Sequence, residues 1–105
     1  MVNIYRDEKL PRIAFSDRLD TTNSADASKV VKDALKQINT NLILDVSKLN
    51  YISSAGLQVI LLCAKDMSSK GRKVYLYGAK DDVLDIFEIS GFLTFLVKID
   101  SLDNA

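Results

Sequence analysis

The sequence contains no histidine, one cysteine and one proline among its 105 residues. Without histidine the chain lacks the commonest general base, the serine-histidine triad and the imidazole ligands of most zinc sites. The single cysteine, Cys63, cannot form an internal disulfide, which is consistent with a protein of a reducing compartment. We expect Cys63 to be a small buried side chain rather than a reactive thiol, since the sequence places no definite cation beside it.

An excess of charge and a long apolar run are also missing. The 14 basic and 14 acidic residues cancel, which argues against a general nucleic-acid binder and against recruitment to anionic lipid. The longest apolar run, Val59 to Ala64, is far shorter than the roughly 20 residues of a membrane span. The N-terminus has no basic region followed by an apolar stretch, as a secretory signal would. We therefore expect a cytoplasmic protein with neither a membrane nor a nucleic-acid partner.

The residues that are present suit one compact domain over positions 1–105, because 48% of them are hydrophobic. Apolar alternation and short apolar runs predict strands, and apolar residues at helical spacing predict helices. Their order predicts an α/β fold with a mixed, mostly parallel sheet of four to five strands and three to four packed helices. The first two strands would form a hairpin whose turn passes through Asp7 and Glu8. The predicted strands are 2–5, 12–15, 42–46, 74–78 and 95–99, and the predicted helices are 24–38, 54–69 and 81–90.

Capping and turn residues indicate where these elements begin and end. Asn23 is the expected N-cap of the first helix, and Gly71 and Gly91 are expected to end the second and third. The polar residues 47–50 are expected to form a turn after the strand 42–46. The predicted core stripe of the first helix is Ala27, Val30, Val31, Ala34, Leu35 and Ile38, and that of the second is Leu57, Ile60, Leu61, Ala64 and Met67.

Two serines stand at the junction of a strand and a helix, in the stretch "YISSAGLQVIL" (51–61). A serine at a helix start is an ordinary N-cap, and Ser53 could accept from the amide of Ala55 or Gly56. The hydroxyl of Ser54 would then point outward at the first helical position. A nucleophilic role for Ser54 lacks a histidine and a Ser-x-x-Lys spacing, and a phosphate-binding loop lacks its glycines and lysine. A further interpretation is that another protein phosphorylates one of these serines.

The longer segment "LILDVSKLNYISSAGLQVIL" resembles the signature of the STAS domain, specifically of the bacterial anti-sigma-factor antagonists. In that family an apolar strand, an aspartate, a short turn and an aromatic-apolar pair precede Asp-Ser-Ser/Thr-Gly-Leu-Gly, which opens a helix. The segments "FSDRLDTTNSADASKVVKDAL" and "GRKVYLYGAKDDVLDIFEISGFLTFLVKIDSLDNA" resemble the family's first loop and helix and its final part. The resemblance covers nearly the whole chain.

Position by position, the resemblance places Ser54 on the serine that is phosphorylated in the family. Ser53 stands where aspartate is usual, and Ala55 where a second serine or threonine is usual. Gly56 and Leu57 match the motif, whereas Gln58 replaces a common glycine. The replacement of aspartate leaves Ser53 as a second, less favoured phosphorylation site. In the first loop, Ser16 replaces a frequent glycine and Asp20 matches the usual acidic residue.

The resemblance implies an anti-sigma-factor antagonist that acts as a binding switch and is not an enzyme. Unphosphorylated, it would bind an anti-sigma factor that is also a serine kinase of the histidine-kinase-like ATPase fold; phosphorylation at Ser54 would end that complex, and a PP2C-type phosphatase would restore it. The resemblance implies no cofactor and no metal. Because the carboxyl ends of parallel strands share one edge, we expect the loop after the second strand beside Ser54. The predicted partner-binding residues are Asp20, Thr21, Thr22, Asn23, Ser53, Ala55, Gly56, Leu57, Gln58, Leu61 and Leu62.

Several alternatives stay open from the sequence. The domain could be a scaffold subunit of a larger assembly, such as a stressosome or a transporter, or a small enzyme that uses Ser54. On the second helix, Val59, Leu62 and Cys63 form a further apolar line, which is either buried or an exposed docking strip. Asp81, Asp82 and Asp85 fit a solvated helix start better than a metal site.

Overall fold

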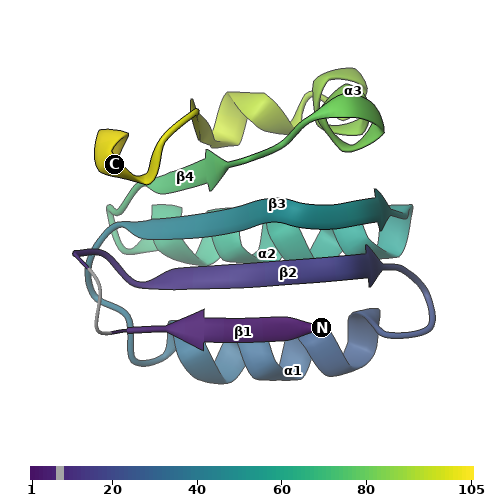
Figure 1. Ribbon diagram of the computed structural model, residues 1–105. Helices are drawn as coiled ribbons and strands as arrows, with labels where there is room; N and C mark the ends of the chain where they lie inside the picture. Colours follow the sequence, from purple (N-terminus) through teal and green to yellow (C-terminus); the bar gives the residue numbers. More distant parts are fainter. Residues whose placement is uncertain (7–8) are drawn as a thin grey trace.

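A five-stranded sheet with its strands in sequence order frames the computed structural model, which describes residues 1–6 and 9–105 (Figure 1). The strand β1 runs antiparallel to β2, and the later neighbours are parallel. The predicted α/β class, mostly parallel sheet and N-terminal hairpin are confirmed, whereas the predicted turn through Asp7 and Glu8 lies outside the described residues. The strands are β1 (Val2–Tyr5), β2 (Arg12–Leu19), β3 (Leu42–Ile52), β4 (Val74–Tyr77) and β5 (Val97–Ile99).

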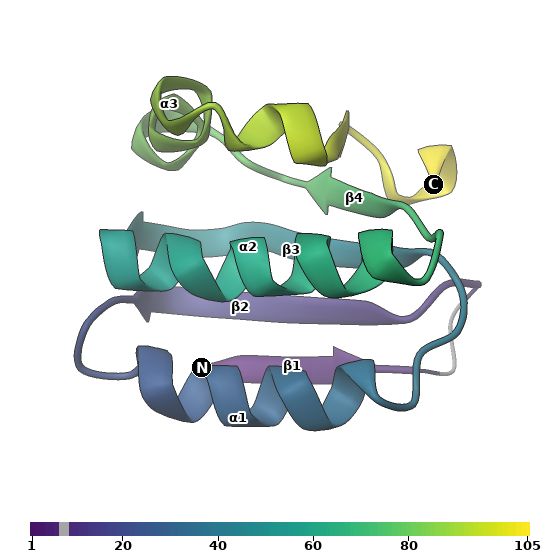
Figure 2. The ribbon, with the colours of Figure 1, turned by 180° about the vertical axis from the view of Figure 1, so that it is seen from behind.

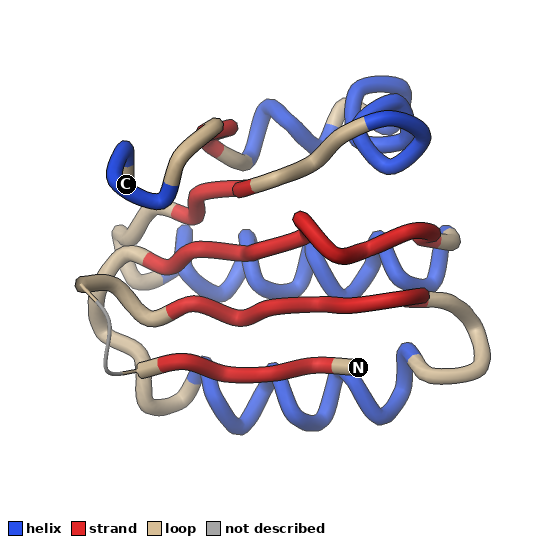
Figure 3. The backbone as a smooth tube through the Cα atoms, viewed as in Figure 1, coloured by secondary structure: helices blue, strands red, loops and turns tan. Residues whose placement is uncertain are grey.

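Two of the three helices that the described residues form cover one face of this sheet (Figure 2). Figure 2 shows α1 (Ser24–Leu35) and α2 (Ser54–Ser69) side by side on that face, with α3 (Asp81–Ser90) beyond β4. Two short 3-10 turns, η1 (Phe92–Phe95) and η2 (Leu102–Asn104), flank β5. In Figure 3 the opposite face of β1, β2 and β3 is turned to the viewer, and no helix of the described chain lies in front of it. The core therefore lies between the sheet and α1 and α2, and it extends to Val83 and Phe87 of α3.

The core stripes agree with the prediction in most positions. The predicted burial of Val30 is wrong, because this residue is 42% exposed while its neighbour Val31 is fully buried. In α2 the buried positions are Gly56, Val59, Ile60, Cys63, Ala64 and Met67. Leu57 and Leu61 are only partly buried, because the face of α2 that meets the sheet is centred on Ile60 and Cys63.

The strand β3 is longer than predicted and contains the residues that were expected to form a turn. It continues through 47–50 to Ile52. The polar residues are accommodated by two register shifts against β2, between Ala14 and Ser16 and between Asp17 and Arg18. The Asp45 carboxylate accepts hydrogen bonds from the Ser47 amide at 2.9 Å and from the Ser47 hydroxyl at 2.6 Å. This local turn-type bonding sits inside a bulged strand, which explains why the pattern resembled a turn.

Besides β3, the strand β2 runs past the predicted end to Leu19, and the ends of the helices agree only in part. Gly71 and Gly91 have φ of 71° and 77° and follow α2 and α3 as expected. The helix α1 ends at Leu35 rather than near residue 38, and the Lys70 ammonium donates to the Leu35 carbonyl at 2.6 Å. The last strand begins at Val97, because residues 92–95 form η1 directly after the left-handed Gly91.

Candidate functional site: the serine pair at the start of α2

The two serines between β3 and α2 have different roles. Ser53 has extended backbone angles and is the N-cap of α2, and its Oγ accepts a hydrogen bond from the Gly56 amide at 3.3 Å. This confirms the predicted cap. Ser54 is the first residue of the helix and is exposed. Its hydroxyl forms no hydrogen bond within the part of the chain that the structure describes. Ser54 therefore presents a free hydroxyl at a helix N-terminus, where an anion is favoured by the free amides and the helix dipole.

The loop between β2 and α1 is attached directly to the serine pair. The Ser53 amide donates to the Leu19 carbonyl at 3.0 Å. The following residue, Asp20, accepts from the amide and hydroxyl of Thr22 at 3.0 and 2.6 Å and from Arg18 Nε at 3.0 Å. These hydrogen bonds, that of the Thr22 hydroxyl first and that of Arg18 second, hold the pKa of the Asp20 carboxyl below its usual value. The predicted neighbourhood of the two loops at one edge of the sheet is thus confirmed.

Asn23 occupies the N-cap position of α1, but its side chain does not cap the helix. Its Oδ1 accepts from the Asp20 amide at 2.9 Å, and its Nδ2 donates to the Arg18 carbonyl at 2.8 Å. The predicted capping hydrogen bond is wrong, because the amide oxygen is already used within the loop. Asn23 instead helps to fix the shape of the loop next to Ser53.

The predicted partner-binding residues are unequally accessible. Thr21, Thr22 and Gln58 are exposed, as is the predicted phosphorylation site Ser54, whereas Gly56 is buried and can only shape the surface. The further apolar line of α2 is not an exposed strip, since Val59 and Cys63 are 2% and 0% exposed. The remaining predicted residues are partly exposed, and they are Asp20, Asn23, Ser53, Ala55, Leu57, Leu61 and Leu62.

An arginine and a tyrosine beside the serine pair are absent from the predicted set. The Arg18 guanidinium lies over the ring of Tyr51, 4.6 Å from its centroid, and the two residues are paired in the register of β2 and β3. The Arg18 side chain is 62% exposed and Tyr51 is 43% exposed. The register of the two strands brings the pair together: Leu19 lies opposite Ile52, so the residues before them, Arg18 and Tyr51, also lie opposite each other. The prediction ended the first of these strands at Phe15 and therefore missed the contact.

The groups at this edge can present a hydroxyl but supply little for catalysis. The chain has no histidine, and burial raises the pKa of the Cys63 thiol to about 12, which keeps it protonated and unreactive. Within the described residues no group of three histidine, cysteine or acidic side chains could hold a metal ion. No helix in this part of the chain is long and apolar enough to span a membrane.

Comparisons with known proteins show the family of the chain. A family model described as the STAS domain matches residues 2–105. The chain belongs to the STAS domain family. It is 37% identical over 86 residues to the putative anti-sigma factor antagonist BtrV of Bordetella bronchiseptica, across 79% of this chain and 74% of that protein. It is 28% identical over 78 residues to the anti-sigma-B factor antagonist of Listeria monocytogenes, across 70% of this chain and 68% of that protein.

The fold is also that of solved STAS structures. The anti-sigma factor antagonist SpoIIAA in its unphosphorylated form superposes with a TM-score of 0.75 at 13% identity, covering 99% of this chain and 92% of that one. A STAS domain protein of Planctomyces limnophilus superposes with a TM-score of 0.88 at 9% identity, covering 98% and 92%. At these identities the likeness establishes the fold.

Proposed function

We propose that the protein is an anti-sigma-factor antagonist, a binding switch that phosphorylation of Ser54 turns off. The observation that carries the proposal is the division of roles between the two serines. Ser53 is engaged as the helix cap, and Ser54 offers an exposed hydroxyl that does no structural work. The relatives named as anti-sigma factor antagonists support the same function.

The partner, in this proposal, is an anti-sigma factor that is also a serine kinase of the histidine-kinase-like ATPase fold. It would contact the β2–α1 loop and the first turns of α2, where the half-exposed side chains of Leu57, Leu61 and Leu62 lie C-terminal to Ser54. An apolar contact of this kind would cover Ser54 and exclude water from it. A PP2C-type phosphatase would return the protein to its binding state.

Phosphorylation would act on the interface and not on the fold. A phosphate adds about −1.5 to −2 charges at Ser54, and the helix N-terminus stabilises a negative charge there. The isolated domain should therefore stay folded. In a complex, the same charge would be buried against an apolar or acidic partner surface, and a mismatch of about 3 kcal/mol weakens binding roughly a hundredfold.

An enzymatic role does not suit this site. Ser54 has no histidine anywhere in the chain to act as its base, and Cys63 is buried with a raised pKa. We therefore propose a regulator without catalytic activity. A serine-directed phosphonate should leave Ser54 unlabelled.

The experiment that tests the proposal is mass spectrometry of the protein from its native cells, with fragmentation to locate a phosphate. A single phosphate on Ser54 that phosphatase treatment removes is the expected result, and Ser54→Ala should abolish it while Ser53→Ala should not. Phosphate on Ser53 would move the switch by one residue. If no growth state yields phosphate and Ser54→Ala cells behave as wild type, the switch is wrong and the scaffold alternative replaces it.

A further inference from the structure

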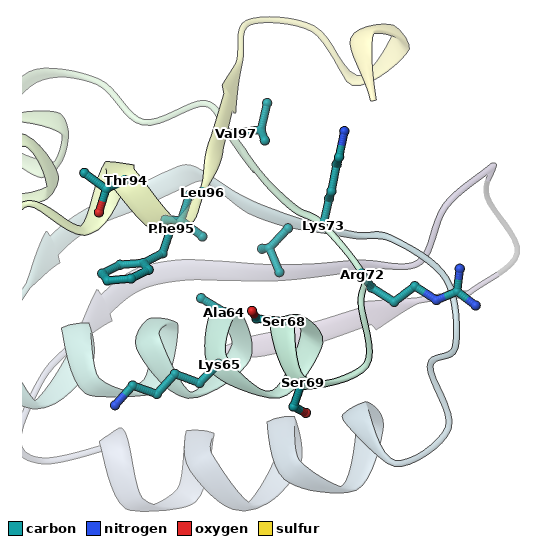
Figure 4. Close-up of a pocket in the computed structure, with 11 residues that line it drawn as sticks. Ala64, Lys65, Ser68, Ser69, Arg72, Lys73, Thr94, Phe95, Leu96 and Val97 are labelled. Carbon is teal, nitrogen blue, oxygen red and sulfur yellow. The ribbon is translucent and has the colours of Figure 1, made fainter.

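An open hollow lies at the end of α2 that is remote from Ser54. It has a volume of about 590 Å³ and is bordered by the second half of α2, the start of β4 and the segment from η1 to β5 (Figure 4). Apolar side chains of Ala64, Val74 and Leu96 form its inner wall. The helix α2 has 16 residues, so its two ends are roughly 24 Å apart at 1.5 Å per residue. The hollow is therefore separate from the serine pair.

The border of the hollow carries positive charge only. Lys65, Arg72 and Lys73 line it, and no carboxylate does. None of the three forms an ion pair with the described residues, whereas Lys36, Lys70 and Lys98 each pair with an aspartate. A helix dipole accounts for cations just past its C-terminus, but Lys65 lies more than one turn before the end of α2. In a chain of zero net charge, this is a local excess of three positive charges.

The same border exposes large apolar side chains. Phe95 is 62% exposed and Val97 is 42% exposed, and both line the hollow. Phe95 precedes Leu96, which is 8% exposed, so the chain buries one side chain here and leaves its neighbour open. Exposed apolar groups ringed by charge are a feature of protein-binding surfaces.

The directions of the cationic side chains identify the kind of ligand. Figure 4 shows Lys65 extending to one side of the hollow, and Arg72 and Lys73 extending to the other in different directions. Their charged groups do not converge, as they would around a small anion such as phosphate. They suit a longer ligand whose negative charges lie on both sides of an apolar centre.

We propose that this hollow docks an acidic segment of a partner protein. An apolar side chain of that segment would rest against Phe95 and Val97, with carboxylates on one side near Lys65 and on the other near Arg72 and Lys73. The acidic character follows from the three cations without a described ion-pair partner. Because the hollow is remote from Ser54, it can be occupied whether or not Ser54 is phosphorylated, and this proposal stands independently of the proposed switch.

The test is an NMR titration of the ¹⁵N-labelled protein with an acetylated and amidated pentapeptide, in which one leucine is flanked by two acidic residues on each side. We expect amide shifts at Ala64, Ser68, Val74 and Leu96, which weaken as salt is raised because exposed charges are screened. The triple variant Lys65→Glu/Arg72→Glu/Lys73→Glu should raise the peptide's dissociation constant at least tenfold.

A matched control is available on the same molecule. Lys29, Lys32 and Lys36 are exposed and line a second hollow, which also contains the carboxylates of Asp33 and Asp66. Reversing these three lysines to glutamate changes the net charge equally and should leave the shifts at Ala64 and Leu96 in place. Phe95→Ser, or serine in place of the peptide's leucine, should weaken binding several-fold. Circular dichroism would verify that each variant is folded.

Three results would overturn the proposal. Equal loss of binding in the two triple variants would reduce the effect to general electrostatic attraction. The same shifts produced by inorganic phosphate alone would identify a small-anion site. Shifts at the hollow that change on dilution, without peptide, would show that a second copy of the chain occupies it.

Discussion

The start of α2 lies so close to the end of β2 that a Cβ on Gly56 would be 2.3 Å from the carbonyl oxygen of Leu19. The same atom would be 2.8 Å from Ile52 Cγ1. The Leu19 oxygen is fixed, because it accepts from the Ser53 amide. The absence of a side chain at Gly56 is therefore what lets the serine pair sit against the β2–α1 loop.

Gly56→Ala should destabilise the protein by about 3 kcal/mol, the upper part of the range for overpacked positions, because backbone rather than a flexible side chain must move. Urea denaturation would measure this loss of unfolding free energy. Gly71→Ala is the matched control: it has φ of +71° but open space around its Cβ position, so it should cost only about 1 kcal/mol of left-handed strain. Equal costs for the two variants would show that the contact with Leu19 is not limiting.

The two serines should differ in their effect on stability. Ser53→Ala removes the N-cap bond to Gly56 and should cost about 1 kcal/mol, whereas Ser54→Ala removes an exposed hydroxyl and should stay within about 0.5 kcal/mol. Paired chemical denaturation curves are sufficient to compare them. A larger loss for Ser54→Ala would mean that its hydroxyl is structural, and would weaken its assignment as the switch.

The sequence predicted the parts of the site that local signals determine. The cap by Ser53, the start and end of α2 and the position of Gly91 after α3 each follow from residues adjacent in the chain, as does the burial of Cys63. The parts that failed depend on long-range pairing. Residues 47–50 carry turn-type side chains, yet pairing with β2 holds them in β3, which bulges to keep its place beside that strand. Asn23 occupies the N-cap position of α1, but its Oδ1 accepts a hydrogen bond from the Asp20 amide instead of from the helix. The Arg18–Tyr51 stack could not be found without the register of the two strands.

The loop held by Asp20 should loosen in acid. In the folded protein the pKa of the Asp20 carboxyl is lowered from 3.8, first by the hydrogen bond from the Thr22 hydroxyl and then by that from Arg18. A lowered pKa means that the unfolded chain binds the proton more readily, so Asp20 contributes stability above about pH 4 that is lost as pH falls through the folded value. The difference in unfolding free energy between the wild type and Asp20→Asn should therefore shrink as the pH is lowered from about 5 to below 3.8.

The cause of this shift can be checked at the carboxyl group itself. Thr22→Val removes the hydroxyl bond that contributes most, and should raise the Asp20 pKa in a ¹³C NMR titration. Arg18→Gln should raise it too, to a smaller extent. If neither variant moves the titration of Asp20, the hydrogen bonds of the loop are not what lowers its pKa.

The contact of Lys70 with α1 gives a prediction that depends on two helices at once. The Lys70 ammonium donates to the carbonyl oxygen of Leu35, the last residue of α1, at 2.6 Å and to that of Ile38, just beyond the helix, at 3.3 Å. It also lies 3.1 Å from Asp66 Oδ2. That oxygen is buried and has no hydrogen-bond partner in the described chain. Lys70→Met should cost about 2 kcal/mol, since it removes charged donors from α1 and leaves a buried carboxylate oxygen without its cation.

A double-mutant cycle separates these two contributions. Asp66→Ala removes the carboxylate. In that background, Lys70→Met should therefore lower the unfolding free energy only by the contribution of the hydrogen bonds to Leu35 and Ile38. The sum of the two single changes should therefore exceed the double change by about 0.5–1 kcal/mol, the coupling expected for residues in direct contact. The midpoints of urea unfolding, measured at one pH near neutrality, would give all four corners of the cycle. Strict additivity would mean that Lys70 acts on α1 alone and that Asp66 is stabilised by solvent, in which case the contact between the end of α1 and the end of α2 rests on the two carbonyl bonds.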